Sequence, residues 1–161
     1  MNILAIDPGT EESGWCSFHP DRGVLGCGVK PNDIMLDEVR SSCADVLAIE
    51  MVASYGMPVG REVFETVRWI GRFQQVWNCP DDVMLIYRRD VKLHLCNSAK
   101  AKDANIRQAL LDMFPRTGGG KMPQIGTKSK PGPLYGVSSH AWSALALAIT
   151  AHHQIISVES K

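Results

Sequence analysis

The chain has 161 residues, of which 45% are apolar and 21% are charged, and its 17 basic and 17 acidic residues give no net charge at pH 7. This length predicts a single domain, residues 1–161, because it allows one full core and is too short for two comfortable ones. No apolar run approaches the roughly 20 residues of a membrane span, and the N-terminus lacks the basic region and cleavage site of a signal peptide. We therefore expect a cytoplasmic protein that does not interact with membranes.

Charge is unevenly distributed along the chain. Residues 1–87 contain 13 acidic and 6 basic residues, a net charge of −7, whereas residues 88–130 contain 10 basic and 3 acidic residues, a net charge of +7. A fold with one acidic and one basic part can bind cations on one side and polyanions on the other. The alternative is a solvated surface whose charges have no partner.

An aspartate ends the first apolar segment. Asp7 follows Asn2-Ile3-Leu4-Ala5-Ile6 and precedes Pro8-Gly9, a pair that turns the chain back. A carboxylate in so apolar a run is costly to desolvate unless a cation or a hydrogen-bond donor faces it. Asp7 therefore indicates a metal or phosphate site, and the alternative is an aspartate that only caps the turn.

Strands are predicted at five places. Residues 2–6, 14–18 and 24–29 are short extended segments joined by tight turns, and such short connections imply antiparallel neighbours. Residues 46–50 and 83–87 are continuous apolar runs, which are typical of buried strands.

Helices are predicted between and after these strands. Residues 60–78 have the clearest helical periodicity and residues 32–41 the weakest, while residues 102–114 form a third helix that ends before a proline. A last helix is predicted over residues 138–156, with a serine N-cap at 138 or 139. Residues 116–136 contain six glycines and predict a long loop. The stripe expected on the helix at 60–78 comprises Val63, Val67, Ile70, Gln74 and Trp77.

This order of elements predicts an α/β fold. It comprises a mixed five-stranded sheet, with three antiparallel strands followed by two parallel strands, flanked by helices. The first and fourth strands are expected at its centre, so that Asp7 and Glu50, each at the end of one of them, can lie side by side. Two neighbouring carboxylates repel each other unless a divalent cation lies between them.

Several segments resemble one known family. The chain has Ile6-Asp7-Pro8-Gly9-Thr10 followed by Gly14-Trp15, an acid that closes a later buried strand, a lysine-rich start to the penultimate helix, and a last helix that begins His140-Ala-Trp142-Ser143-Ala-Leu-Ala. These features resemble the RuvC family of Holliday junction resolvases, and the order of elements is similar to the ribonuclease H-like fold over nearly the whole chain. Residues 131–136, together with the motif at His140, look most similar to the phage branch, which implies a bacterial or phage-infected cell.

The resemblance implies a divalent-metal-dependent endonuclease that resolves four-way (Holliday) and other branched DNA junctions. By the same resemblance Asp7 and Glu50 are catalytic metal ligands, and His140 stands where family members place a further acid or a histidine. A second acid often follows three residues later in the family, but this chain has Ser143, a departure that puts a full two-metal site in doubt. The implied cofactor is Mg²⁺, with Mn²⁺ able to substitute because an imidazole ligand suits it.

His140 has alternatives to metal binding. It can act as the base that orients or deprotonates water, or it can be a helix N-terminal histidine bonded to water alone. Asp103, in the first turn of its helix, can cap that helix or reach a metal; it and Ser143 are candidate helper residues. Trp142, on one stripe with Leu145 and Ile149, is predicted to belong to the core and not to contact a ligand.

DNA binding is expected from the basic segment and from one aromatic residue. Lys100, Lys102 and Arg107 surround the start of a helix, where backbone N–H groups also favour phosphates. Tyr55 lies in an apolar loop that in the resolvases carries an aromatic stacking on opened bases at the crossover; the alternative is a tyrosine buried in its loop. The glycine-rich loop adds three lysines that are expected to be free to follow a DNA backbone: Lys121, Lys128 and Lys130.

Two rival functions share some of these features. An actin-like or sugar-kinase-like ATPase also opens with Ile-Asp-x-Gly-Thr, but such enzymes need a second phosphate loop and a far longer chain. A junction-binding module that kept the fold and lost catalysis is the other rival, and Ser143 favours it. Because a four-way junction is cut at two symmetry-related strands, we expect a homodimer, with Phe64, Arg68 and Gly71 as candidate interface residues.

Overall fold

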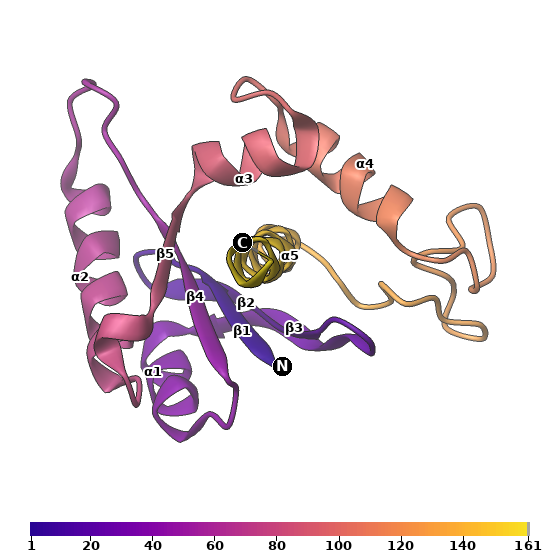
Figure 1. Ribbon diagram of the computed structural model, residues 1–161, viewed down its shortest axis with the longest axis horizontal. Coiled ribbons are helices and arrows are strands. Elements are labelled where there is room, and N and C mark those ends of the chain that lie inside the picture. Colours follow the sequence, from indigo (N-terminus) through magenta and orange to yellow (C-terminus); the bar gives the residue numbers. More distant parts are fainter. Residues whose placement is uncertain (161) are drawn as a thin grey trace.

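A mixed sheet lies at the centre of the computed structural model, which describes residues 1–160 (Figure 1). The order of its strands is β3-β2-β1-β4-β5. Strands β1, β2 and β3 pair antiparallel, whereas β4 pairs parallel with both β1 and β5. The prediction of three antiparallel strands followed by two parallel strands, with the first and fourth at the centre, is therefore confirmed. The strands are β1 Ile3–Asp7, β2 Glu12–His19, β3 Gly23–Pro31, β4 Val46–Met51 and β5 Met84–Tyr87.

Helices cover both faces of this sheet. Helices α1 and α2 lie on one face and α5 lies across the other, with α3 and α4 packed on the outer side of α5 (Figure 1). None of the helices in residues 1–160 is long and apolar enough to cross a bilayer. The helices are α1 Asn32–Ser41, α2 Arg61–Val76, α3 Arg88–Cys96, α4 Asp103–Met113 and α5 Ala141–Glu159, and a short 3₁₀ turn, η1, spans Pro80–Asp82.

The sheet separates two apolar cores. The larger one joins β1 and β2 to α4 and α5, and every residue of α5 from Ala144 to Ala151 is buried in it. The smaller core joins the other face of the sheet to α1 and α2. Removing this much apolar surface from water from two sides fixes the central strands β1 and β4 firmly, and these are the strands that end in Asp7 and Glu50.

Three details of the secondary structure differ from the sequence-based expectations. The strand expected to be buried at 83–87 is the edge strand β5, in which Leu85 and Tyr87 are exposed, because only β4 pairs with it. Helix α3 was not predicted, since it follows β5 without a turn residue between them. The last helix begins at Ala141, with His140 and not a serine at the N-cap.

The buried face of α2 also differs from the predicted stripe. Val67 is exposed, whereas Thr66, Ile70 and Phe73 face the smaller core. The predicted Ile70 and Trp77 are buried in the smaller core, but the packing of α2 against α1 and β4 buries Thr66 and Phe73 in place of Val67 and Gln74. As a result Phe64 and Val67 are left on the surface.

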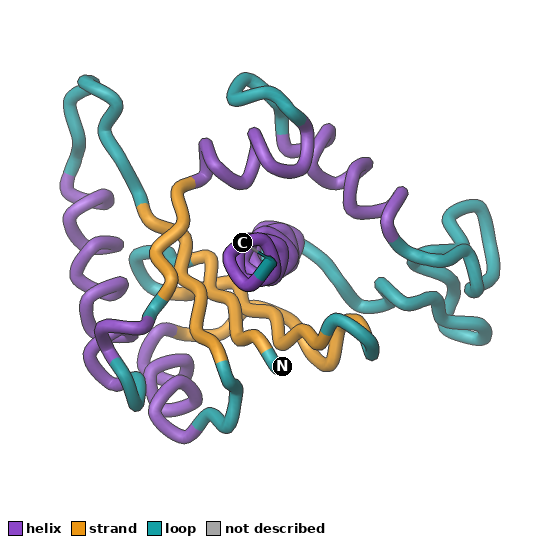
Figure 2. Tube along the Cα trace, viewed as in Figure 1, coloured by secondary structure: helices purple, strands orange, loops and turns teal. Residues whose placement is uncertain are grey.

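Residues 116–136 form an ordered loop, so the expectation of a segment free to follow DNA is wrong. Figure 2 shows it beside the end of α4 as a folded teal segment. Gly118, Gly126 and Gly132 lie against one another, and a side chain on any of them would collide with the backbone of the loop. Backbone hydrogen bonds close the loop, among them Gly118 N–H to Pro123 O at 2.8 Å and Gly132 N–H to Ile125 O at 2.9 Å. These backbone contacts determine where along the loop its basic residues are presented.

Candidate active site

Two carboxylates meet at the ends of the central strands. Asp7 is the last residue of β1, and Glu50 lies at the end of β4. The parallel register pairs Ile6 with Ile49, so that Asp7 and Glu50 follow at the same level. Their side chains are mostly buried, 15% and 13% exposed respectively. The predicted juxtaposition of the two acids is thus what the fold produces.

Burial makes both carboxylates reluctant to ionise. Desolvation raises the pKa of Asp7, although the His140 imidazole, the Arg88 guanidinium and the Ser143 hydroxyl act in the opposite direction. Desolvation and the nearby charge of Asp7 raise the pKa of Glu50 to about 7, against the lowering effect of Arg88. A pair of buried acids with raised pKa values is the electrostatic signature of a functional site.

His140 lies directly over Asp7. Its Nδ1 is 3.0 Å from Asp7 Oδ2, a hydrogen-bond distance at which an ionised carboxylate accepts and the imidazole Nδ1–H donates. Two features bring it there. Ser139 has a left-handed backbone with φ of 47°, and Gly14, the register partner of Asp7 on β2, leaves room for it. A Cβ at Gly14 would lie 2.6 Å from His140 Cβ.

Arg88 is the site residue that the sequence did not reveal. Its Nη1 donates to Glu50 Oε2 at 3.2 Å and its Nη2 donates to Asp103 Oδ1 at 2.5 Å. Asp103 thus pairs with Arg88 and does not cap α4, where the Asn105 side chain accepts the hydrogen bond from the Lys102 backbone N–H. The only signal in the sequence that could have placed Arg88 near Glu50 is its position directly after β5, which is the parallel neighbour of β4.

The raised pKa of Glu50 predicts how pH changes the stability of the metal-free protein. The ordinary pKa of this carboxyl is 4.5 and the folded value is about 7, so between these values the folded state binds more protons than the unfolded state. The free energy of unfolding should therefore fall by roughly 3 kcal/mol as pH rises from about 4.5 to about 7. Urea unfolding in EDTA across this range measures the effect.

The matched control for that experiment is Glu50→Gln, which removes the titrating group. The difference between the wild type and Glu50→Gln isolates this carboxyl from groups such as His94 and His153, whose lowered pKa values act with the opposite sign. A difference that does not change with pH would contradict the buried, high-pKa glutamate.

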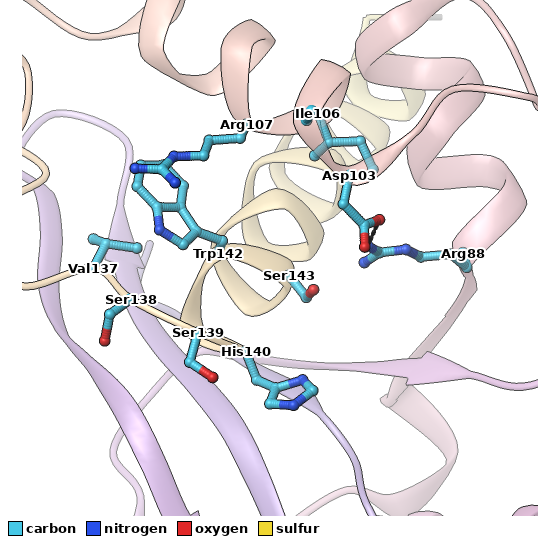
Figure 3. A pocket seen from close by; sticks show the side chains of 11 residues that line it. Arg88, Asp103, Ile106, Arg107, Val137, Ser138, Ser139, His140, Trp142 and Ser143 are labelled. Atoms are coloured by element: carbon cyan, nitrogen blue, oxygen red, sulfur yellow. Dashed lines mark hydrogen bonds and ion pairs between the residues drawn. The ribbon is translucent and has the colours of Figure 1, made fainter. Parts of the chain in front are cut away.

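A cleft of about 650 Å³ opens beside the acids, between α4 and the start of α5. Figure 3 shows the Arg88–Asp103 pair at one end, Arg107 against Trp142 at the other, and Ser143 and His140 between them. Trp142, predicted to be core like the buried Leu145 and Ile149, does pack against the larger core, but it is only partly buried and also lines this cleft.

The basic residues predicted to bind DNA are all exposed, and within residues 1–160 none of them forms an ion pair. Three lie around the start of α4 and three lie on the folded loop. Tyr55 is 62% exposed in the turn between β4 and α2, which excludes the alternative that its loop buries it. The six basic residues are Lys100, Lys102, Arg107, Lys121, Lys128 and Lys130.

The predicted metal ligands are paired with other groups. Among residues 1–160, no group of three or more His, Cys, Asp or Glu side chains lies close enough together to hold a metal ion. Asp7 bonds to His140, and Glu50 bonds to Arg88. Their chemistry still fits a divalent cation, because carboxylate oxygens and imidazole are ligands for Mg²⁺ and Mn²⁺ and because a cation relieves the repulsion between Asp7 and Glu50. Arg88 contacts only Oε2 of Glu50, so Glu50 can offer its other oxygen to an ion or exchange Arg88 for it.

Solved structures with the same fold exist. A structure of Thermus thermophilus RuvC aligns with 98% of this chain and 97% of its own, at a TM-score of 0.64 and 16% sequence identity. The chain has the RuvC fold. A structure of T. thermophilus RuvC in complex with a Holliday junction substrate aligns with a TM-score of 0.63 and 17% identity, covering 98% of this chain and 96% of the other.

The RuvC fold confirms the architecture that the sequence motifs implied, over nearly the whole chain. No protein-family model matches the sequence, and no curated protein matches it either. At 16–17% identity the likeness concerns the fold, so the roles of individual residues rest on their own geometry.

Proposed function

We propose that this protein is a structure-specific endonuclease that resolves four-way and other branched DNA junctions by metal-dependent phosphodiester hydrolysis. The observation that carries the proposal is the pair of buried acids, Asp7 and Glu50, at the ends of the two central parallel strands with His140 above them. A chain of the same fold has been solved with a Holliday junction substrate. The similarity of the last-helix motif to the phage branch remains a prediction.

Asp7, Glu50 and His140 are the proposed ligands of Mg²⁺, for which Mn²⁺ can substitute; in the alternative in which His140 acts as a base, the two carboxylates alone bind the cation. Ser143 and Asp103 border the same space and are proposed as helpers, through a bound water or through Arg88. When bound, the cation neutralises charge on the phosphate and lowers the pKa of a bound water. This chain offers the cation one carboxylate fewer than a RuvC family member that has an acid at the position of Ser143.

The chain's own groups supply the rest of the chemistry. As the alternative to binding the metal, His140 can orient water or take a proton from it, because its side chain is 64% exposed while its Nδ1 is held by Asp7. Arg88 stands beside Glu50, and once released from it the guanidinium can pair with a phosphate oxygen. The exposed basic residues around α4 and on the ordered loop bind the DNA backbone.

The basic surface makes a prediction about salt. Replacing Lys100, Lys102 and Lys128 by Gln should weaken binding to every branched DNA and lower the slope of log K against log salt by about 0.9 for each phosphate that the variant no longer neutralises. Fluorescence anisotropy with a labelled junction at several salt concentrations measures this slope. Arg40→Gln, which removes an exposed charge on α1 at the other side of the sheet, is the control. An unchanged slope in the triple variant would mean that these lysines face away from the DNA.

Tyr55 is proposed to stack on bases opened at the crossover. It projects from a turn in which Gly56 also has a positive φ, with Met57 exposed next to it. An exposed aromatic on a loop beyond the end of β4 suits this role, because base stacking offsets the cost of opening the junction.

A homodimer is proposed on symmetry, with the outer face of α2 as the interface. Phe64 is 60% exposed and Gly71 has open space over it. Val67 extends this apolar face, while Arg68 pairs with Glu65 of the same helix. Two copies related by a two-fold axis would present two active sites to the two strands that must be cut.

A junction-binding protein with weakened catalysis is the second candidate. The Arg88–Glu50 ion pair favours it, since this pair already neutralises a carboxylate that a metal would need. Cleavage of four-way, three-way and linear duplexes with Mg²⁺ and with Mn²⁺ decides between the two. Cuts in branched DNA alone support the endonuclease; tight binding of junctions without cuts in either metal supports the binding protein.

A further inference from the structure

Two residues near the start of α5 are not buried, although the rest of the first half of this helix is. From Ala141 to Ala151 every residue is buried except Trp142 and Ser143. Ser143 faces Asp7, whereas the Trp142 indole lines the cleft between α4 and α5. Trp142 therefore packs against the larger core with part of its side chain and leaves the rest open to water in the cleft.

Arg107 lies across the cleft from this indole. Its guanidinium is 4.8 Å from the centre of the Trp142 ring (Figure 3), and in residues 1–160 no carboxylate pairs with it. Cation–π contacts at exposed sites are weak. Arg107 can therefore move from the ring to a phosphate without leaving a carboxylate unpaired. The face of the Trp142 ring can then contact another flat group.

An aromatic ring and one aliphatic side chain line this end of the cleft. Val137 lies beside Trp142 with Ser138 next to it, whereas Arg88 and Asp103 lie at the other end, with Ile106 beside Asp103 (Figure 3). His140 and Ser143 stand between the two ends. The cleft thus has a flat aromatic and apolar compartment directly beside the groups proposed to act on a phosphate.

We infer that this compartment binds an unpaired nucleobase next to the cleaved phosphate, with the base stacked on Trp142 and Arg107 on the flanking phosphate. An indole face accepts any base, since each has a π face, so the site should be tolerant of sequence. A base in a closed duplex cannot reach the ring, whereas one at an opened branch point can. The inference rests on the proposed junction endonuclease and names a contact that selects opened DNA.

Fluorescence of 2-aminopurine tests this contact without cleavage. Four-way junctions that carry the probe in turn at each position around the crossover are mixed with wild-type protein in EDTA. Stacking on an indole quenches the probe, so we expect quenching at one or two positions. Trp142→Leu should abolish this quenching and weaken junction binding about tenfold or more, whereas Trp142→Phe should retain both.

The two variants are matched, because both keep an apolar side chain and only one keeps an aromatic ring. Thermal melting checks that both fold, and affinity for linear duplex, where no base is open, should be the same in both and in the wild type. Absence of a quenched position in the wild type overturns the inference by itself, whether or not a variant folds. If the wild type cuts junctions while Trp142→Leu binds them equally well, the inference fails and the endonuclease stands. If the wild type neither binds nor cuts junctions, both fail.

Discussion

Asp7→Asn and Glu50→Gln are each expected to abolish strand cleavage while junction binding stays intact or becomes stronger. Each replacement removes a charge from the proposed metal site and spares the exposed basic surface. The metal contributes several kcal/mol of charge stabilisation in the transition state, so cleavage should fall about a thousandfold or more. Cleavage of a labelled four-way junction in Mg²⁺, with binding measured in EDTA, gives both quantities.

The stability of these variants separates a functional role from a structural one. Because burial raises the pKa of both acids, their neutral replacements should fold at least as well as the wild type near pH 7. Asp81→Asn and Glu62→Gln, at exposed positions, are the matched controls and should leave cleavage unchanged. Full activity in Asp7→Asn or in Glu50→Gln would rule out the proposed metal site.

The position of the two acids could be predicted because it depends on local patterns. The apolar runs before Asp7 and before Glu50 have strand length and need burial on both faces, which puts them at the centre of a sheet. A helix-connected parallel pair then brings the ends of both strands to one edge. His140 was found through its motif, since nothing in its own neighbourhood marks it as a ligand.

The pairing of Arg88 could not be predicted, because it depends on three separate elements. The side chain comes from the start of α3 and reaches across to β4 and to the first turn of α4. No periodicity records such a contact. The ordered loop escaped prediction for a similar reason. Its glycine content indicated turns, but the close approach of Gly118, Gly126 and Gly132 brings together residues up to 14 positions apart.

The exposure of Trp142 to the cleft was not predicted, because helical spacing groups this residue with Leu145 and Ile149. That stripe is indeed buried along most of α5. At its first turn, however, α4 stands away from α5 and leaves the cleft that Trp142 lines. Whether a residue on an apolar stripe faces a core or a cleft is decided by the neighbouring helix, and the sequence of α5 does not contain that information.

His140→Ala is expected to be nearly inactive, since it removes both the proposed third ligand and the group that holds Asp7. His140→Asp should keep much of the activity, because a carboxylate at the same position can bind Mg²⁺ and is the residue type that the resemblance to the RuvC family leads us to expect there. Ser143→Ala should matter less, as its hydroxyl acts on Asp7 only as a minor hydrogen-bond donor. Cleavage rates of the three variants on one four-way junction, at saturating Mg²⁺, give the order of their effects.

Gly14 provides an independent check on the position of His140. Gly14→Ala puts a methyl group where the His140 backbone and Cβ now lie, so it should displace the imidazole from Asp7 and mimic the inactivity of His140→Ala while all three proposed ligands are still present. Gly60→Ala, at a position with open space around it and an ordinary extended backbone, is the matched glycine control and should leave cleavage unchanged. An active His140→Ala together with an inactive Ser143→Ala would defeat the assignment. The remaining ligand would then have to be sought elsewhere, with Asp103, which Arg88 already links to Glu50, as the first candidate.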